Sequence, residues 1–112
     1  TVVDPFDLKA MEQALKDACG VPMKIMQTCC QAIRLIEAYA GIGASIAISD
    51  AGVAVALCRA ALQGASLNVL INAKAMTDRA YAKQLLSETD GMLDRYVPLA
   101  DQIYRRIADS FK

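Results

Sequence analysis

The stretch from Ser49 to Ala73, SDAGVAVALCRAALQGASLNVLINA, decides the fold of this 112-residue chain. It is apolar on nearly every side, with Asp50 near its start and Asn68 and Asn72 near its end. In a helix that turns by about 100° per residue, Asp50 and Asn68 lie about five whole turns apart, and Asn72 lies about 40° further round. The pattern therefore predicts one long helix with three polar side chains on the same face.

Small and apolar residues continue this face between and beyond the polar ones. They are Ala54, Leu57, Ala61, Gly64 and Ala75. Another backbone or a flat ligand can approach such a row closely. Burying a carboxylate and two amides without partners is costly. The row is therefore expected either to make internal hydrogen bonds or to bind a ligand.

The composition favours a single all-α domain over residues 1–112. Hydrophobic residues make up 55% of the chain but aromatic residues only 5%, which suits closely packed helices better than a sheet. Twelve basic and twelve acidic residues are scattered, so neither a nucleic-acid partner nor a membrane surface is expected. The four cysteines form no CxxC pair and histidine is absent, so no metal is expected. We expect free, buried thiols in a cytoplasmic protein.

The first helical path is predicted from Pro5 to Ala40. Asp4 is expected to cap it, and Pro22 to bend it without changing the hydrophobic phase. Glycines at 41 and 43 are expected to end the path. A short apolar linker is predicted over 44–48, followed by a helix capped by Ser49 or Asp50.

That second helix has no strong breaker before Leu86. At 1.5 Å per residue it would be about 55 Å long, whereas a compact domain of this size is roughly 35 Å across. We therefore expect a break near Gly64 or Asn72, or a helix that projects beyond the domain. A new cap is predicted at 87–90, followed by a last helix with a kink at Pro98. The three long, kinked antiparallel paths leave apolar surface for a partner chain.

The central stretch resembles the family of formiminotetrahydrofolate cyclodeaminases and methenyltetrahydrofolate cyclohydrolases. The resemblance rests on three groups of residues: Ser49-Asp50-Ala51-Gly52-Val53, then Ala61, Gly64 and Ala65, then Asn68-Val69 and Ile71-Asn72. The segment KAMEQALKDACGVP, from Lys9 to Pro22, is similar to the ALKxAxxVP helix of that family. Members of the family are longer and carry a glycine-rich PGGGS-type segment, so the chain resembles the C-terminal part of such a domain.

The resemblance implies an all-α, dimeric enzyme of one-carbon folate metabolism that needs no cofactor or metal. The cyclodeaminase cyclises formiminotetrahydrofolate and releases ammonia, and the cyclohydrolase hydrolyses 5,10-methenyltetrahydrofolate. On this basis Asp50 is the candidate catalytic residue, while Ser49, Asn68 and Asn72 are candidates for binding the folate. Two asparagines that usually precede the Ser-Asp pair correspond to Ala44 and Ile46 here. We therefore expect the 112 residues alone to be inactive.

Structural alternatives exist for each of these residues. Asp50 after Ser49 is a common helix cap, and the two asparagines could join helices in a tight core. The chain as a whole could be a non-catalytic helical dimerisation or assembly module. The basic side chains of Lys74, Arg79 and Lys83 suit either the glutamate tail of a folate or an ordinary solvated helix end.

Overall fold

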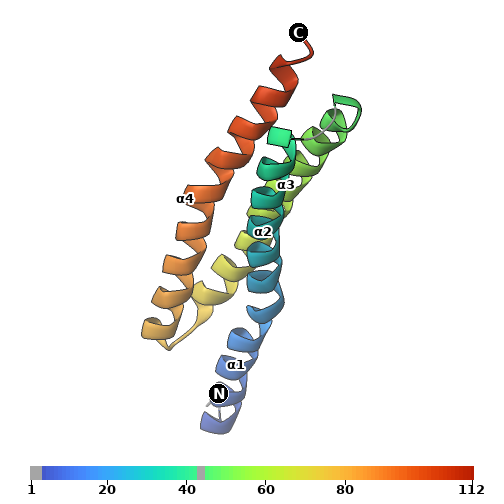
Figure 1. Ribbon diagram of the computed structural model, residues 1–112. Helices are drawn as coiled ribbons and strands as arrows, with labels where there is room; N and C mark the ends of the chain where they lie inside the picture. Colours follow the sequence, from blue (N-terminus) through green and yellow to red (C-terminus); the bar gives the residue numbers. More distant parts are fainter. Residues whose placement is uncertain (1–3, 43–44) are drawn as a thin grey trace.

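The computed structural model describes residues 4–42 and 45–112, and within these it consists of helices and short turns. Figure 1 shows three long antiparallel paths, the first of which is divided into two helices. The all-α prediction and the up-down-up arrangement are confirmed. The helices are α1 (Pro5–Ala18), α2 (Gly20–Ile42), α3 (Ser45–Ala75) and α4 (Arg79–Asp109).

The first path begins and bends where the sequence predicts. The Asp4 side chain accepts a hydrogen bond of 2.9 Å from the backbone N–H of Phe6, and Pro5 occupies the first turn. Only Cys19 separates α1 from α2. Its backbone N–H donates to Lys16, and its carbonyl accepts from Met23 at 3.0 Å, so hydrogen bonding continues across the bend.

The predicted start of the second path is wrong. The helix α3 begins at Ser45, so Ser49 and Asp50 lie inside it and neither residue is its cap. The predicted linker is also helical from Ser45 to Ile48, while its residue Ala44 and the predicted terminator Gly43 lie outside the described residues. This apolar, charge-free segment extends the helix because it contains no residue that would end one.

The second path breaks near Asn72, which was one of the expected alternatives. The helix α3 passes through Gly64 and ends at Ala75, three residues after Asn72. A side chain closes the turn: Arg79 donates hydrogen bonds of 3.0 Å to the carbonyls of Ala73 and Met76. Ala73 lies in the last turn of α3, where its carbonyl also accepts a hydrogen bond of 3.2 Å from the N–H of Met76, and Met76 follows the end of the helix.

The cap of the last helix lies nine residues earlier than predicted. Asp78 caps α4 by accepting a hydrogen bond of 3.1 Å from the N–H of Tyr81, and the segment 87–90 is internal to α4. The helix also continues through Pro98 to Asp109. A cap is recognised in sequence by residue type alone, and both segments offer suitable residues.

The helices α2, α3 and α4 share one core that runs along a rod of 64 × 19 × 19 Å. The radius of gyration, 18.2 Å, is well above the roughly 13 Å of a compact domain of this size. The bundle as a whole is therefore much more elongated than a compact domain of this size. The largest fully buried side chains are Met26, Ile33, Leu62, Ile103, Val55, Val69, Thr89 and Cys19.

Candidate functional site

The polar row lies on the side of α3 that the bundle does not cover. Asp50 and Asn68 are exposed and Asn72 is half-buried. The Asn72 amide donates a hydrogen bond of 2.8 Å to the backbone carbonyl of Asn68. Among the residues that the structure describes, the side chains of Asp50 and Asn68 make no hydrogen bond or ion pair. Internal hydrogen bonding therefore accounts for only one member of the row, and two remain free to meet a ligand.

Large apolar side chains share this uncovered side of α3. Four of them are 59–65% exposed: Val53, Leu57, Leu67 and Ile71. With helical spacing they form a stripe next to the polar row, and Gly64 and Ala61 lie in the same stripe. We call this surface, from Asp50 to Asn72, the open face of α3. A carboxylate and an amide beside small apolar residues can orient a flat ligand and exchange protons with it.

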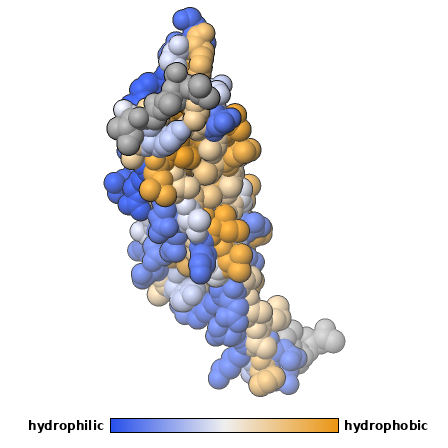
Figure 2. Space-filling model, turned by 45° about the vertical axis from the view of Figure 1, so that its right-hand side comes forward, coloured by the Kyte–Doolittle hydropathy of each residue, from blue (hydrophilic) through white to orange (hydrophobic). Residues whose placement is uncertain are grey.

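Exposed apolar side chains also occur on other helices. Exposed apolar residues on α1 and α2 include Phe6, Met11, Val21, Ile25 and Leu35. Figure 2 shows hydrophobic side chains gathered in a band along the rod. Contiguous apolar surface of this kind marks an interaction site, so the open face is suited to packing against further protein.

The segment Ala47–Ala75 of α3 also has the length and hydrophobicity of a membrane span. It contains 29 residues with a mean hydropathy of 1.5, and 28% of its apolar window is buried in the bundle. The core helix of a soluble protein has the same features, because it too is long and apolar. The absence of a membrane partner therefore stays a prediction.

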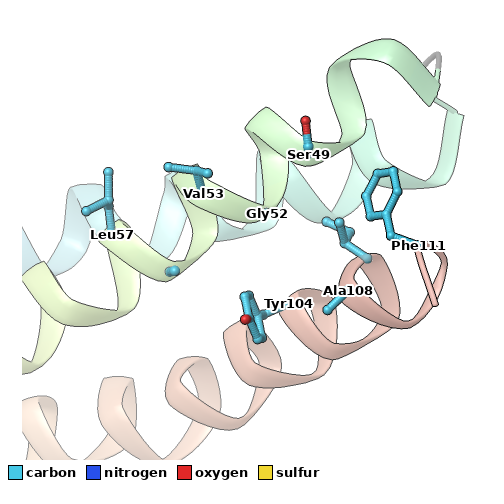
Figure 3. A pocket seen from close by; sticks show the side chains of 9 residues that line it. Ser49, Gly52, Val53, Leu57, Tyr104, Ala108 and Phe111 are labelled. Atoms are coloured by element: carbon cyan, nitrogen blue, oxygen red, sulfur yellow. The ribbon is translucent and has the colours of Figure 1, made fainter.

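Ser49 lies at the edge of the open face towards α4, because Val53 and Leu57 of that face line the same cavity as Ser49. It borders an apolar cavity of about 350 Å³ between the first half of α3 and the end of α4. Figure 3 shows Tyr104 of α4, and Phe111 just beyond the end of α4, facing α3 across this cavity. Gly52 forms its floor, where an added Cβ would lie 3.2 Å from Ile107. The structure thus places Ser49 beside an apolar cavity, while the three other candidates follow the open face.

A polar clamp at the opposite end of the rod was not predicted from the sequence. The Glu12 carboxylate of α1 accepts hydrogen bonds of 2.8 Å from the N–H of Thr77 and 3.0 Å from the N–H of Asp78. Lys16 forms an ion pair of 2.9 Å with Asp78, and its ammonium lies 4.7 Å from the centre of the Tyr81 ring. We call these contacts the α1 clamp. They hold α1 against the turn between α3 and α4.

Hydrogen bonding shifts the titration of all three charged groups of the clamp. The two backbone N–H groups lower the pKa of Glu12, and the hydrogen bond from Lys16 lowers the pKa of Asp78. The bond to Asp78 raises the pKa of Lys16. Each shift favours the charged form, so the clamp is stabilised by ionisation.

The cysteines occupy the core as free thiols, as predicted. Cys19, Cys29 and Cys30 are buried and Cys58 is half-buried. Burial raises the pKa of each thiol, which keeps it protonated and unreactive near neutral pH. In the described part of the chain, no three acidic, cysteine or histidine side chains gather into a possible metal site.

Comparison with known proteins identifies the family. The family model described as formiminotransferase-cyclodeaminase matches residues 7–91, which is most of the chain. This range contains the α1 clamp, the whole open face of α3 and the first part of α4. The chain belongs to the formiminotransferase-cyclodeaminase family.

Two named relatives from this family are similar over much of the chain. A methenyltetrahydrofolate cyclohydrolase of Methylorubrum extorquens is 41% identical over 97 residues, which is 87% of this chain and 47% of that protein. A formimidoyltransferase-cyclodeaminase of Rattus norvegicus is 31% identical over 84 residues, which is 75% of this chain and 16% of that protein. The chain thus spans about half the length of the first relative and much less of the second.

Proposed function

We propose that the open face of α3 is one wall of a one-carbon folate site in a formiminotransferase-cyclodeaminase family enzyme, and that further protein supplies the other wall. The observation that carries this proposal is the alignment of Asp50, Asn68 and Asn72 on an uncovered, apolar side of a helix. Relatives named for methenyltetrahydrofolate hydrolysis and for cyclodeamination support the choice of ligand. The domain to which this wall belongs extends beyond the 112 residues in this proposal.

Asp50 transfers a proton at the reacting carbon in this account. Both candidate reactions pass through a tetrahedral carbon between two nitrogens. Hydrolysis needs a proton removed from water, and cyclisation needs a proton delivered to the departing ammonia. The Asp50 carboxylate is available for this work because no described residue pairs with it. Asn68 and Asn72 each carry an acceptor oxygen and an amide that can orient the pterin or the attacking water.

Turnover by the full-length parent tests the role of Asp50. Asp50→Asn should lower kcat at least about 100-fold, because it removes a general acid–base group. The matched control is Asp90→Asn, which makes the same chemical change at an exposed position of α4. Unchanged kcat in Asp50→Asn, or an equal loss in the control, would remove Asp50 from the mechanism.

The 112-residue chain alone is inactive in this proposal. Its candidate catalytic face is open, and it spans only 47% of the cyclohydrolase that it resembles. Purified chain should therefore hydrolyse 5,10-methenyltetrahydrofolate no faster than buffer. A rate comparable to that of the parent would show that the site is complete without further protein.

We further propose that the parent is a cytoplasmic homodimer. The exposed apolar residues of α1, α2 and α3 support association, and the free thiols suit a reducing compartment. The same apolar surface favours a second candidate function, a non-catalytic assembly module. A module of this kind would associate in sedimentation experiments but gain no thermal stability from a folate analogue.

A further inference from the structure

Helix α2 carries an apolar stripe on the side that faces away from the bundle. Its members recur at alternating intervals of four and three residues: Val21, Ile25, Thr28, Ala32, Leu35 and Tyr39. Val21 is 70% exposed and Leu35 is 71% exposed, so neither α3 nor α4 covers the stripe. Intervals that average 3.5 residues are those of a helix that packs lengthwise against a second helix. We call this stripe the α2 seam.

One half of the α2 seam is hollow. Val21, Lys24, Ile25 and Thr28 line a groove of about 280 Å³ together with Cys29. The first four occur at positions i, i+3, i+4 and i+7, which are the four positions that surround a hole between the side chains of one helix. A hole of this kind accepts a single apolar side chain from a facing helix. The seam therefore has room for one large apolar residue of another helix.

The other half of the α2 seam carries a side chain that fits this hole. Leu35 is the most exposed large apolar residue of α2. An antiparallel second copy, related by a twofold axis beside Cys30, brings its own Leu35 level with Ile25 of the first, since each lies five residues from the axis. By the same symmetry, Leu35 of the first copy is level with the hole of the second. The seam is thus complementary to itself.

The same register matches the remaining members of the seam. Val21 is level with Tyr39 of the second copy, and Thr28 is level with Ala32. Large side chains therefore meet at both ends of the contact, and small ones meet in the middle, where the two backbones approach each other. A contact between identical surfaces requires this correspondence about its twofold axis. The register that Leu35 requires thus pairs the other four residues by size as well.

Burial of the α2 seam has little polar cost. The Thr28 hydroxyl already donates a hydrogen bond of 2.8 Å to the carbonyl of Lys24, so it needs no partner from the facing helix. Lys24 is exposed, and its apolar stem can lie over the seam while the ammonium group stays in water. The two copies of Lys24 lie on opposite sides of the axis, about 18 Å apart. This separation exceeds the Debye length of about 8 Å at physiological salt.

We infer that the α2 seam is the interface between two copies of this chain, with the two α2 helices antiparallel and Leu35 of each copy in the hole of the other. The inference rests on the homodimer proposed above and identifies its contact surface. It does not depend on the choice of folate as ligand. The open face of α3 takes no part in this contact.

Sedimentation equilibrium of the 112-residue chain tests the location of the interface. Leu35→Asp places a charge in the hole of the second copy, so it should raise the Kd of the dimer at least about tenfold. The matched control is Leu67→Asp on the open face of α3, where Leu67 is 65% exposed, and it should leave the Kd unchanged. Circular dichroism checks that both variants keep the helical content of the wild type.

Two results of this experiment would overturn the inference. A Kd that rises in Leu67→Asp but not in Leu35→Asp would assign the dimer to the open face of α3, while the homodimer itself would stand. A wild-type chain that stays monomeric would contradict both the seam and the homodimer. The folate proposal is tested separately, by the turnover of Asp50→Asn.

Cysteine cross-linking tests the register and leaves Leu35 in place. A Val21→Cys chain is mixed with a Tyr39→Cys chain and treated with a short bis-maleimide. The mixture should give a cross-linked heterodimer, because the two positions are level across the seam. Each variant alone should give no more cross-linked product than the wild type, since its two introduced thiols would lie about 27 Å apart. Cross-linking of either variant alone, or none in the mixture, would overturn the antiparallel contact.

Discussion

Glu12 is the residue on which the attachment of α1 depends most directly. Its carboxylate accepts two backbone N–H groups from a turn that is 65 and 66 residues away in sequence. Hydrogen bonds to a charged acceptor are stronger than those between neutral groups. No residue of α1 is fully buried, so α1 makes only a small apolar contact with the rest of the bundle. The hydrogen bonds and the ion pair of the clamp compensate for this.

Removing the charge of Glu12 is expected to loosen α1. Glu12→Gln keeps one acceptor oxygen but loses the negative charge, so it should lower Tm by a few degrees. Glu37→Gln is the matched control, because Glu37 is exposed and makes no hydrogen bond to the described residues. The measurement is thermal unfolding followed by circular dichroism. Equal Tm values for Glu12→Gln and the wild type would contradict the role of the clamp.

The clamp also predicts a pH dependence. The folded-state pKa values of Glu12 and Asp78 lie below their ordinary values of 4.5 and 3.8. Their contribution to stability is therefore present above the ordinary values and is lost as the pH falls through the lowered ones. For Lys16 the pKa is raised above 10.5, so its contribution is complete below that pH and is lost as the pH rises through the raised value.

Measurement of Tm between pH 2 and 7 checks the acid side of this dependence. The wild type should lose stability below about pH 4.5, and Glu12→Gln should show a shallower decline, since one of the titrating groups is gone. Parallel curves for the two proteins would show that Glu12 does not contribute to the acid transition.

Individual residues also show what sequence can predict here. The alignment of Asp50 with Asn68 follows from the helical period alone, and for that reason the prediction of a shared face needed no tertiary information. The role of Asp50 as a cap was wrong because the helix starts at Ser45. The Glu12 clamp could not be predicted, because its partners are backbone groups of a turn that only the tertiary fold brings next to α1.

At the scale of elements, α3 combines one covered and one uncovered side. Gly52 and Gly64 are the weakest points of α3 by helix propensity, yet the helix continues through both. An added Cβ at Gly64 or Gly91 would meet no atom within 4 Å. The latter two glycines differ in position: Gly64 lies on the open face of α3, whereas Gly91 lies in α4.

Gly64→Ala should therefore have opposite effects in two contexts. In the 112-residue chain it should stabilise the fold by about 0.5–1 kcal/mol, because alanine loses less backbone entropy than glycine. In the full-length parent it should be neutral or destabilising, since the wall that covers α3 approaches this position closely. Gly91→Ala should stabilise both proteins. Equal stabilisation of chain and parent by Gly64→Ala, measured by urea unfolding, would show that nothing packs on this part of α3.

The ends of the elements were harder to predict than their existence. The three long paths were predicted correctly from hydrophobic spacing and from the Asp4-Pro5 start. A break near Asn72 was one of the expected alternatives, but the residues of the turn after Ala75 could not be predicted, because no glycine or proline marks it. It depends on Arg79, which hydrogen-bonds the carbonyls at the end of α3, and on Glu12 from another helix. Such a turn is specified by tertiary contacts that a single sequence does not display.

At the scale of the whole molecule, the rod exposes much of the apolar surface that its composition provides. Fourteen large hydrophobic residues in the described chain are exposed, and they occur on all four helices. Surface of this extent promotes association. Sedimentation of the 112-residue chain should therefore show a dimer or a larger species at micromolar concentration. A strictly monomeric chain would indicate that these exposed hydrophobic residues remain in contact with water and do not drive self-association.

The central claim is that the open face of α3 contacts the folate, and Asn68 provides its most direct test. The Asn68 side chain makes no hydrogen bond within the described chain, so Asn68→Ala should not lower the stability of the fold. The decisive measurement is the Kd of a folate analogue for the full-length parent. We predict an affinity about tenfold weaker in Asn68→Ala and unchanged in Gln63→Ala, a control at an exposed position of the same helix. An unchanged Kd in Asn68→Ala, or an equal loss in both variants, would contradict it.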